Sequence, residues 1–168
     1  MFLIPKTSKQ KYLSKMASLN IFDDTAKKLC TGDWHYVTMF SNGFRDDNAY
    51  LAGDGMKTNT NAYLGDLEVN DVTNALKRMG YYEKHVIDKN SPVYCASHAR
   101  ACVDLLFSRI KNNAPLDSIR LDDWFTTSEA KKTVYRLIDI LYFQVEKDVQ
   151  LKIDEWKASN PLTQYIAK

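Results

Sequence analysis

The chain has few of the residues that break or crosslink regular structure. Its 168 residues include only six glycines, four prolines and three cysteines. Few glycines and prolines allow few tight turns, so helix should dominate the fold. Three cysteines are too few, and odd in number, for a disulfide framework, which favours a reducing compartment such as the cytoplasm. No run of about 18 apolar residues occurs, so the sequence predicts no membrane contact through a spanning segment.

An excess of one charge is also missing, since 23 Lys and Arg stand against 21 Asp and Glu. The charges are nevertheless segregated, because residues 23–71 carry nine acids and four bases whereas residues 72–112 carry three acids and seven bases. No basic stripe with interleaved aromatic residues is present, so direct nucleic-acid binding is not expected. The acidic segment is either a set of solvent-facing loop residues or a contact surface for a basic partner.

The length and the 45% hydrophobic composition are those of one globular domain. We predict an α+β fold, a mostly helical single domain with a small antiparallel β-sheet and a long C-terminal helix. Residues 1–32 should form a helical N-terminal part, residues 33–66 a small β-meander, and residues 67–168 a helical part.

Alternating aromatic and β-branched residues predict a strand over residues 34–40. The sequence Ser41-Asn42-Gly43 ends it, because Asn and Gly tolerate positive φ. Further strands are expected over residues 49–52, before a turn that begins at Gly53, and near residues 62–64.

Helical periodicity is strongest in the second half of the chain. Apolar residues at i, i+3, i+4 and i+7 predict a helix over residues 70–79, ended by Gly80. Ser91-Pro92 should open a helix that runs to Lys111, and a weaker helical face covers residues 8–18. A capping box at Thr126 begins one continuous helix over residues 127–158. One apolar stripe of it is expected to contact another chain: Val134, Ile138, Leu141, Val145 and Val149.

Three residues that could carry chemistry share one face of the helix predicted over 91–111. Cys95, His98 and Cys102 are best explained as core residues, and a zinc site or a catalytic thiol are the alternatives. A thiol hydrolase would use Cys95 near a helix N-terminus, with His35 as its base. Phosphate loops and the common hydrolase motifs are absent, so we expect no catalytic residue, no metal and no cofactor.

Residues 30–44 read CTGDWHYVTMFSNGF. This segment resembles the central motif of the ArdB/KlcA antirestriction family, which has a glycine step, Trp-x-Tyr/Phe-Tyr-x-Leu and then Ser-Asn-Gly-Gly-Phe. One residue is inserted before the serine and one glycine is missing before the phenylalanine. The resemblance implies a plasmid- or phage-borne protein, not an enzyme, that protects invading DNA from a host defence nuclease. The matching residues are Trp34, Tyr36, Ser41, Asn42, Gly43 and Phe44.

We therefore expect a non-enzymatic inhibitor from a mobile element that counteracts a bacterial defence system, of the restriction or CRISPR type, by protein–protein interaction. The alternatives are the cysteine hydrolase and an immunity or antitoxin protein. The expected partner is a host protein with a basic surface, such as a defence nuclease, and the chain is a candidate homo-oligomer. The predicted partner-binding residues are Asp46, Asp47, Asp54, Trp34, Tyr36, Asn42, Phe44 and Tyr50.

Overall fold

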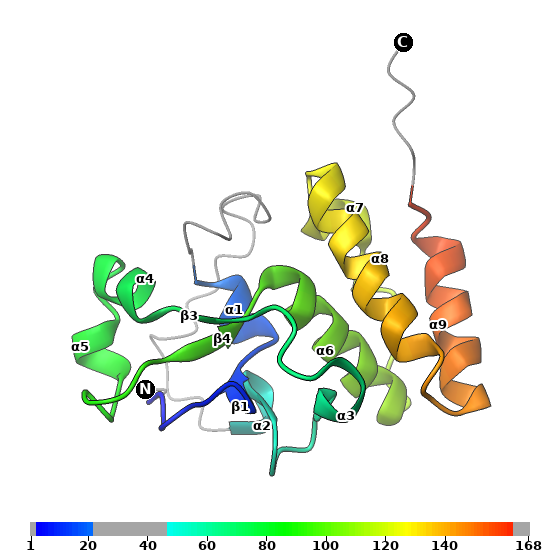
Figure 1. The fold of residues 1–168 in the computed structure, drawn as a ribbon. Coiled ribbons are helices and arrows are strands. Elements are labelled where there is room, and N and C mark those ends of the chain that lie inside the picture. Colours follow the sequence, from blue (N-terminus) through cyan, green and yellow to red (C-terminus); the bar gives the residue numbers. More distant parts are fainter. Residues whose placement is uncertain (1–2, 22–46, 163–168) are drawn as a thin grey trace.

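The computed structural model describes residues 3–21 and 47–162 of the chain. In these residues helices predominate and the strands form one small sheet, so the α+β class is confirmed (Figure 1). The described part ends in a long C-terminal helix, as expected. No helix in it combines the length and the apolar character needed to cross a membrane.

The sheet has four short strands in the order β2-β1-β4-β3. β1 pairs with β2 and β3 pairs with β4 in antiparallel fashion, whereas β1 and β4 run parallel. The sheet is therefore mixed, which corrects the expectation of an antiparallel meander over residues 33–66. Of the strands in the described residues, β2 alone falls in that segment. The strands are β1 Lys11–Leu13, β2 Leu51–Gly53, β3 Val69–Asp71 and β4 Tyr94–Ala96.

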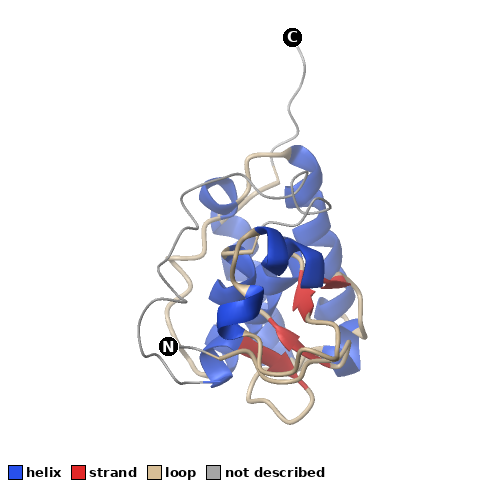
Figure 2. Cartoon of the chain, turned by 90° about the vertical axis from the view of Figure 1, so that its left-hand side faces the viewer, coloured by secondary structure: helices blue, strands red, loops and turns tan. Residues whose placement is uncertain are grey.

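Helices flank the sheet on both sides. Figure 1 shows α4 and α5 on one side and α6, α8 and α9 on the other, and Figure 2 looks at the same arrangement from the α4–α5 side. In the described residues the helices are α1 Met16–Leu19, α2 Asp47–Tyr50, α3 Asn61–Leu64, α4 Thr73–Arg78, α5 Tyr82–His85, α6 His98–Lys111, α7 Leu121–Trp124, α8 Ser128–Tyr142 and α9 Lys147–Ser159.

Strand alternation gives the sheet two different faces. Leu13, Leu51 and Cys95 occupy one row across the sheet and pack in the cluster that includes the apolar side of α4. Tyr12 and its partner Ala52 point to the opposite face, together with alanines of β4 and α6. The small alanine side chains leave room for the Tyr12 ring, which is completely buried.

A second core lies between α6, α8 and α9. The apolar stripe predicted to contact another chain is part of it, since each of its five side chains is 9% exposed or less. The stripe packs within its own chain, so the reason for expecting a homo-oligomer through it does not hold. These residues are Val134, Ile138, Leu141, Val145 and Val149.

The C-terminal helical region is broken, so the prediction of one continuous helix over residues 127–158 is wrong. α8 ends at Tyr142 and α9 begins at Lys147, so four residues separate the two helices. The side-chain amide of Gln144 donates to the carbonyl of Ile140 at 2.9 Å, and that of Gln150 donates to Tyr142 at 2.8 Å. These bonds satisfy carbonyls of the last turn that would otherwise lack an intrahelical donor. Apolar spacing continues through the break and therefore gives no sign of it.

The helix expected over residues 70–79 is present as α4, but it begins only at Thr73 because β3 takes up residues 70 and 71. Gly80 follows it with a φ of 75°, as its position predicted. The Gly80 N–H donates to the Lys77 carbonyl at 3.1 Å, and the Tyr81 N–H donates to the Leu76 carbonyl at 3.0 Å. This pair of bonds is a Schellman motif, which needs a residue that adopts positive φ without strain.

Other element predictions differ from the structure. Residues 8–18 form β1 and the start of α1 in place of a helix, and residues 62–64 lie in α3 in place of a strand. The strand expected over residues 49–52 is divided between α2 and β2. The helix expected over residues 91–111 begins only after Ser97, whose side chain accepts from the first turn of α6, because β4 takes up the preceding residues.

Candidate binding site

Most of the predicted partner-binding residues lie outside the described residues, as does the segment that resembles the antirestriction family. They are Trp34, Tyr36, Asn42, Phe44 and Asp46. Of the others, Asp47 and Asp54 are exposed. Tyr50 is only 8% exposed and packs in the core beneath the sheet. This corrects the prediction for Tyr50, because a buried ring cannot anchor a partner.

The two exposed acids, Asp47 and Asp54, differ in their hydrogen bonds within the protein. The Asp54 carboxylate accepts hydrogen bonds from the side-chain amides of Asn59 at 3.3 Å and Asn61 at 3.1 Å. The Asp54 N–H donates to the Gln10 carbonyl at 2.7 Å. Asp54 therefore organises the loop after β2, whereas Asp47 lies exposed in the first turn of α2. Asp47 is the cleaner probe of a partner contact, since changing Asp54 would also disturb this loop.

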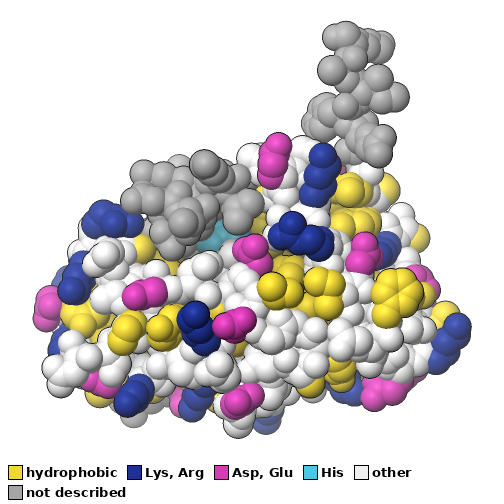
Figure 3. Space-filling view, in the orientation of Figure 1, with side chains coloured by type: hydrophobic (Ala, Val, Ile, Leu, Met, Phe, Trp, Pro, Cys, Tyr) yellow, Lys and Arg dark blue, Asp and Glu magenta, His cyan; other side chains and the backbone are white. Residues whose placement is uncertain are grey.

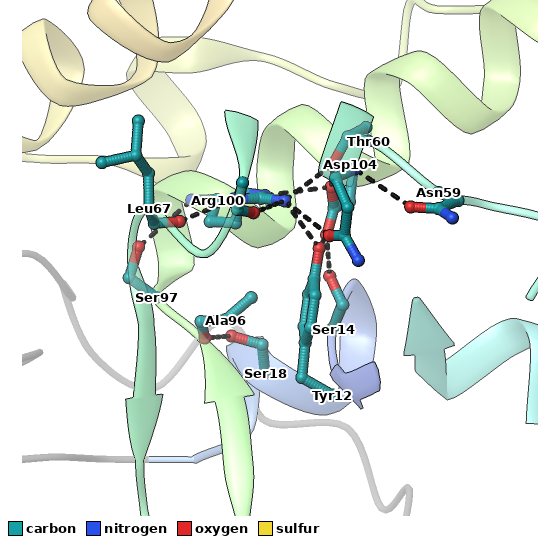
Figure 4. A network of polar contacts seen from close by, with 12 residues as sticks. Tyr12, Ser14, Ser18, Asn59, Thr60, Leu67, Ala96, Ser97, Arg100 and Asp104 are labelled. Atoms are coloured by element: carbon teal, nitrogen blue, oxygen red, sulfur yellow. Dashed lines mark hydrogen bonds and ion pairs between the residues drawn. The ribbon is translucent and has the colours of Figure 1, made fainter. Parts of the chain in front are cut away.

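A buried polar network joins β1, α3 and α6 (Figure 4). Its centre is an ion pair between Arg100 Nε and Asp104 Oδ1 at 3.4 Å, with both side chains 0% exposed. Asp104 also accepts hydrogen bonds from the hydroxyls of Ser14 at 2.7 Å, Thr60 at 2.6 Å and Tyr12 at 3.1 Å. Its members come from separate segments of the chain, so no local sequence pattern predicted this network.

The remaining donors of Arg100 are used as well. Its guanidinium donates to the carbonyls of Leu67 at 2.7 Å and Gly65 at 3.1 Å, and to the Tyr12 hydroxyl at 2.9 Å. Burial, and then the nearby Asp104 carboxylate, raise the pKa of Tyr12 well above its ordinary value, so the phenol stays protonated and donates. Every charge is met by protein groups in a closed space. The network therefore ties distant segments together and has no open side for a substrate.

The cysteines occupy buried positions on different elements. Cys95 lies on β4 and Cys102 on α6, and they are 1% and 0% exposed. The argument that a helix N-terminus activates Cys95 is wrong, because α6 begins only at His98. Burial raises the pKa of Cys102 to about 12. His35, the proposed base, lies outside the described residues. In those that are described, no three His, Cys, Asp or Glu side chains gather as a metal site would require.

An open cavity lies between the loop before α7, α7 itself and α9. Its volume of about 820 Å³ falls within the range of roughly 300–1,000 Å³ that is usual for ligand sites. Part of the lining is apolar, from Ile110, Pro115, Leu116 and Trp156. The rest is charged, and its carboxylates outnumber its basic groups. These are Asp117, Asp122, Asp123 and Glu155, with Arg120 and Lys152.

Hydrogen bonds fix the walls of this cavity. The Trp156 Nε1–H of α9 donates to the Ile119 carbonyl at 2.8 Å, which holds the loop against the helix. The Asn160 side-chain oxygen accepts from the Leu121 N–H at 2.9 Å, and its amide donates to the Trp156 carbonyl at 2.9 Å. The start of α7 is thereby fastened to the end of α9. These hydrogen bonds hold the two sides of the cavity in fixed positions relative to each other.

Two of the four lining carboxylates are already paired. Asp122 accepts from the Lys131 ammonium at 2.7 Å, and Glu155 lies 3.0 Å from the Lys152 ammonium. Asp117 and Asp123 make no ion pair within the described residues. No local sequence pattern predicted this site, because its lining comes from two segments, residues 110–123 and 152–160.

Figure 3 shows how charge is distributed on one face of the molecule. On the face shown in Figure 3, acidic and basic side chains are interspersed, and hydrophobic side chains are exposed between them. Neither sign forms a continuous patch on that face.

Comparisons of the chain with protein-family models, with curated proteins and with solved structures found no match.

Proposed function

We propose that the protein is a non-enzymatic binding protein that counteracts a bacterial defence system by contacting one of its proteins. The open cavity, in whose lining carboxylates outnumber basic groups, carries the binding part of this proposal, since such a site suits a basic partner. Asp47, exposed on α2, adds a second acidic position. The defence role and the mobile-element origin are supported by the resemblance of residues 30–44 to the antirestriction family.

The alternative of a cysteine hydrolase has less support. A catalytic cysteine needs an accessible thiolate, whereas Cys95 is 1% exposed and burial disfavours the thiolate of Cys102. An immunity or antitoxin protein would use the same kind of contact with a different partner. The two binding functions are therefore separated by the identity of the partner and not by the chemistry of the site.

A phage-plating experiment tests the defence role. Phage with unmodified DNA is plated on bacteria that carry a restriction system, a CRISPR system or neither, with and without expression of the protein. We expect expression to restore plating on at least one defended strain toward the level of the undefended strain. Unchanged plating on both defended strains contradicts the defence role. Expressing a variant in which alanine replaces both Cys95 and Cys102 separates binding from thiol chemistry. A binding protein should still restore plating without these thiols, whereas the hydrolase alternative requires Cys95.

A further inference from the structure

The cavity between α7 and α9 specifies the charge of its ligand. We propose that it binds a positively charged peptide segment of the partner, with an arginine side chain placed among the carboxylates of the α7 region and α9. The proposal rests on the proposed function in taking the ligand to be part of a protein. The positive charge of that ligand is argued from the lining residues themselves.

The charge of the lining differs from that of the chain. The whole chain has more basic than acidic residues, 23 against 21. The cavity has four carboxylates and two basic groups. An excess of charge of one sign in a concave site attracts the opposite charge. The field of the cavity therefore favours a cation, although the protein as a whole carries a formal net charge of +2.

Three of the four lining carboxylates are available to such a ligand. Asp117 and Asp123 are exposed and have no ion-pair partner in the described residues. The Lys152–Glu155 pair is solvent-exposed, at 53% and 65% for the two side chains. An exposed pair of this kind is weak, so an incoming guanidinium can compete for Glu155. Arginine suits the site better than lysine, because its planar fork can bind a carboxylate through two hydrogen bonds at once.

The apolar part of the lining suits the rest of an arginine side chain. Pro115 and Leu116 form part of the wall beside the charged residues. Long basic side chains pack their methylene stems on apolar surface while the charged end meets a polar group. The Trp156 indole, held by its bond to Ile119, keeps this wall in place. The cavity therefore offers carboxylates for the guanidinium of an arginine and an apolar wall for its methylene groups.

NMR titration of the purified, isotope-labelled chain tests the proposal. The probe is an acetylated and amidated tri-arginine peptide, and its matched control is the same peptide with citrulline, the neutral isostere of arginine. We expect tri-arginine to shift the Trp156 indole signal and the backbone signals of residues 113–123 and 152–160, and citrulline to leave them unchanged. The binding should weaken as salt is added, because it depends on charge.

A variant pair locates the binding in the cavity. Asp117→Asn combined with Asp123→Asn should weaken tri-arginine binding by about tenfold or more, since each change removes a charge without changing size. Asp148→Asn is the matched control, because Asp148 is an exposed acid on α9 outside the cavity lining. An unchanged Trp156 indole signal in each free variant shows that the cavity wall is intact.

Three results would overturn the proposal. They are no shifts with tri-arginine, equal shifts with citrulline, or equal affinity of the cavity double variant and the parent chain. The peptide titration contains no defence protein, so its outcome is separate from phage plating. Peptide binding without restored plating would discard the defence role alone, and restored plating without peptide binding would discard the cavity proposal alone.

Discussion

Acidic side chains occupy two contrasting regions of this molecule. In the buried network, Asp104 is completely inaccessible and is surrounded by one guanidinium and three hydroxyl donors. In the open cavity, Asp123 is exposed and has no ion-pair partner in the described residues. The two carboxyl groups are chemically the same. Their surroundings differ in the number of protein donors and in access to solvent.

The difference separates a structural role from a binding role. A buried charge is tolerated only when protein groups replace the water that it loses, so each member of the network depends on the others. An exposed carboxylate keeps its water and can exchange it for a ligand at little cost to the fold. Substitutions in the network should therefore change stability, and substitutions in the cavity should change binding.

The largest effect is expected for Arg100→Met. The substitution leaves Asp104 buried without its cationic partner, and such a loss typically costs about 3–5 kcal/mol of the free energy of unfolding. Chemical denaturation monitored by circular dichroism measures the change. Arg136→Met is the control, because Arg136 is 65% exposed and pairs with Glu68 at 3.8 Å. That pair should contribute at most about 1 kcal/mol. Equal losses in both variants would show that the Arg100 network has no special weight.

The next effect concerns the turn that brings Asp54 to the surface. Gly53 has a φ of 104°, and a Cβ at this position would lie 2.0 Å from the Gln10 carbonyl oxygen. Gly53→Ala should therefore cost at least about 1–3 kcal/mol of unfolding free energy, since strain and a backbone clash combine. Gly55→Ala provides the control, because Gly55 also has positive φ but has nothing within 4 Å of that site. Thermal melting should place the Gly55 variant closer to the parent, and the reverse order would contradict this account.

Alkaline pH should destabilise the fold, because the Cys102 thiol and the Tyr12 phenol are buried in their protonated forms. Burial raises the pKa of Cys102 from its ordinary value of 9.0 to about 12. Between these values the unfolded chain loses the thiol proton while the folded chain keeps it, so stability falls as pH rises by up to about 1.4 kcal/mol per pH unit. Cys102→Ala should show a shallower decline between about pH 8.5 and 10.5 in denaturation experiments. Tyr12 acts in the same direction and should keep part of the decline in that variant. Parallel curves for both proteins would exclude a contribution from Cys102.

Local signals predicted part of this architecture. The apolar face of α4 and the glycine after it are set by neighbours within one or two turns, and both were identified correctly. The strands are different, because each has three residues and pairs at long range. Leu13, for example, lies beside Cys95 of the parallel strand. Three residues are too few to show a period, so tertiary pairing decides where these strands form.

The buried network and the cavity were harder to predict from the sequence than the helices and strands. Arg100 and Asp104 are four positions apart on α6, which is the spacing of an ordinary exposed ion pair. Their burial depends on the hydroxyl groups of Tyr12, Ser14 and Thr60, far away in the chain. The cavity likewise forms only when the loop before α7 folds against α9. No single segment contains either arrangement. The segregation of charge along the sequence predicted an acidic surface in residues 23–71. It did not predict the cavity, whose lining residues lie outside that segment.

The smallest effect is expected for Asp47→Lys, which tests whether the acidic surface extends beyond the cavity. Asp47 lies exposed in the first turn of α2, and exposed charges at the edge of an interface mainly change the association rate. The variant should restore phage plating several-fold less than the parent does. Asp148→Lys is the matched control, since Asp148 is an exposed acid in the first turn of α9 and the change in charge is the same. With the isolated partner, the deficit should shrink as salt rises from about 0.05 M to 0.5 M, because the Debye length shortens. Equal protection by the two variants would restrict the partner contact to the cavity and to residues outside α2.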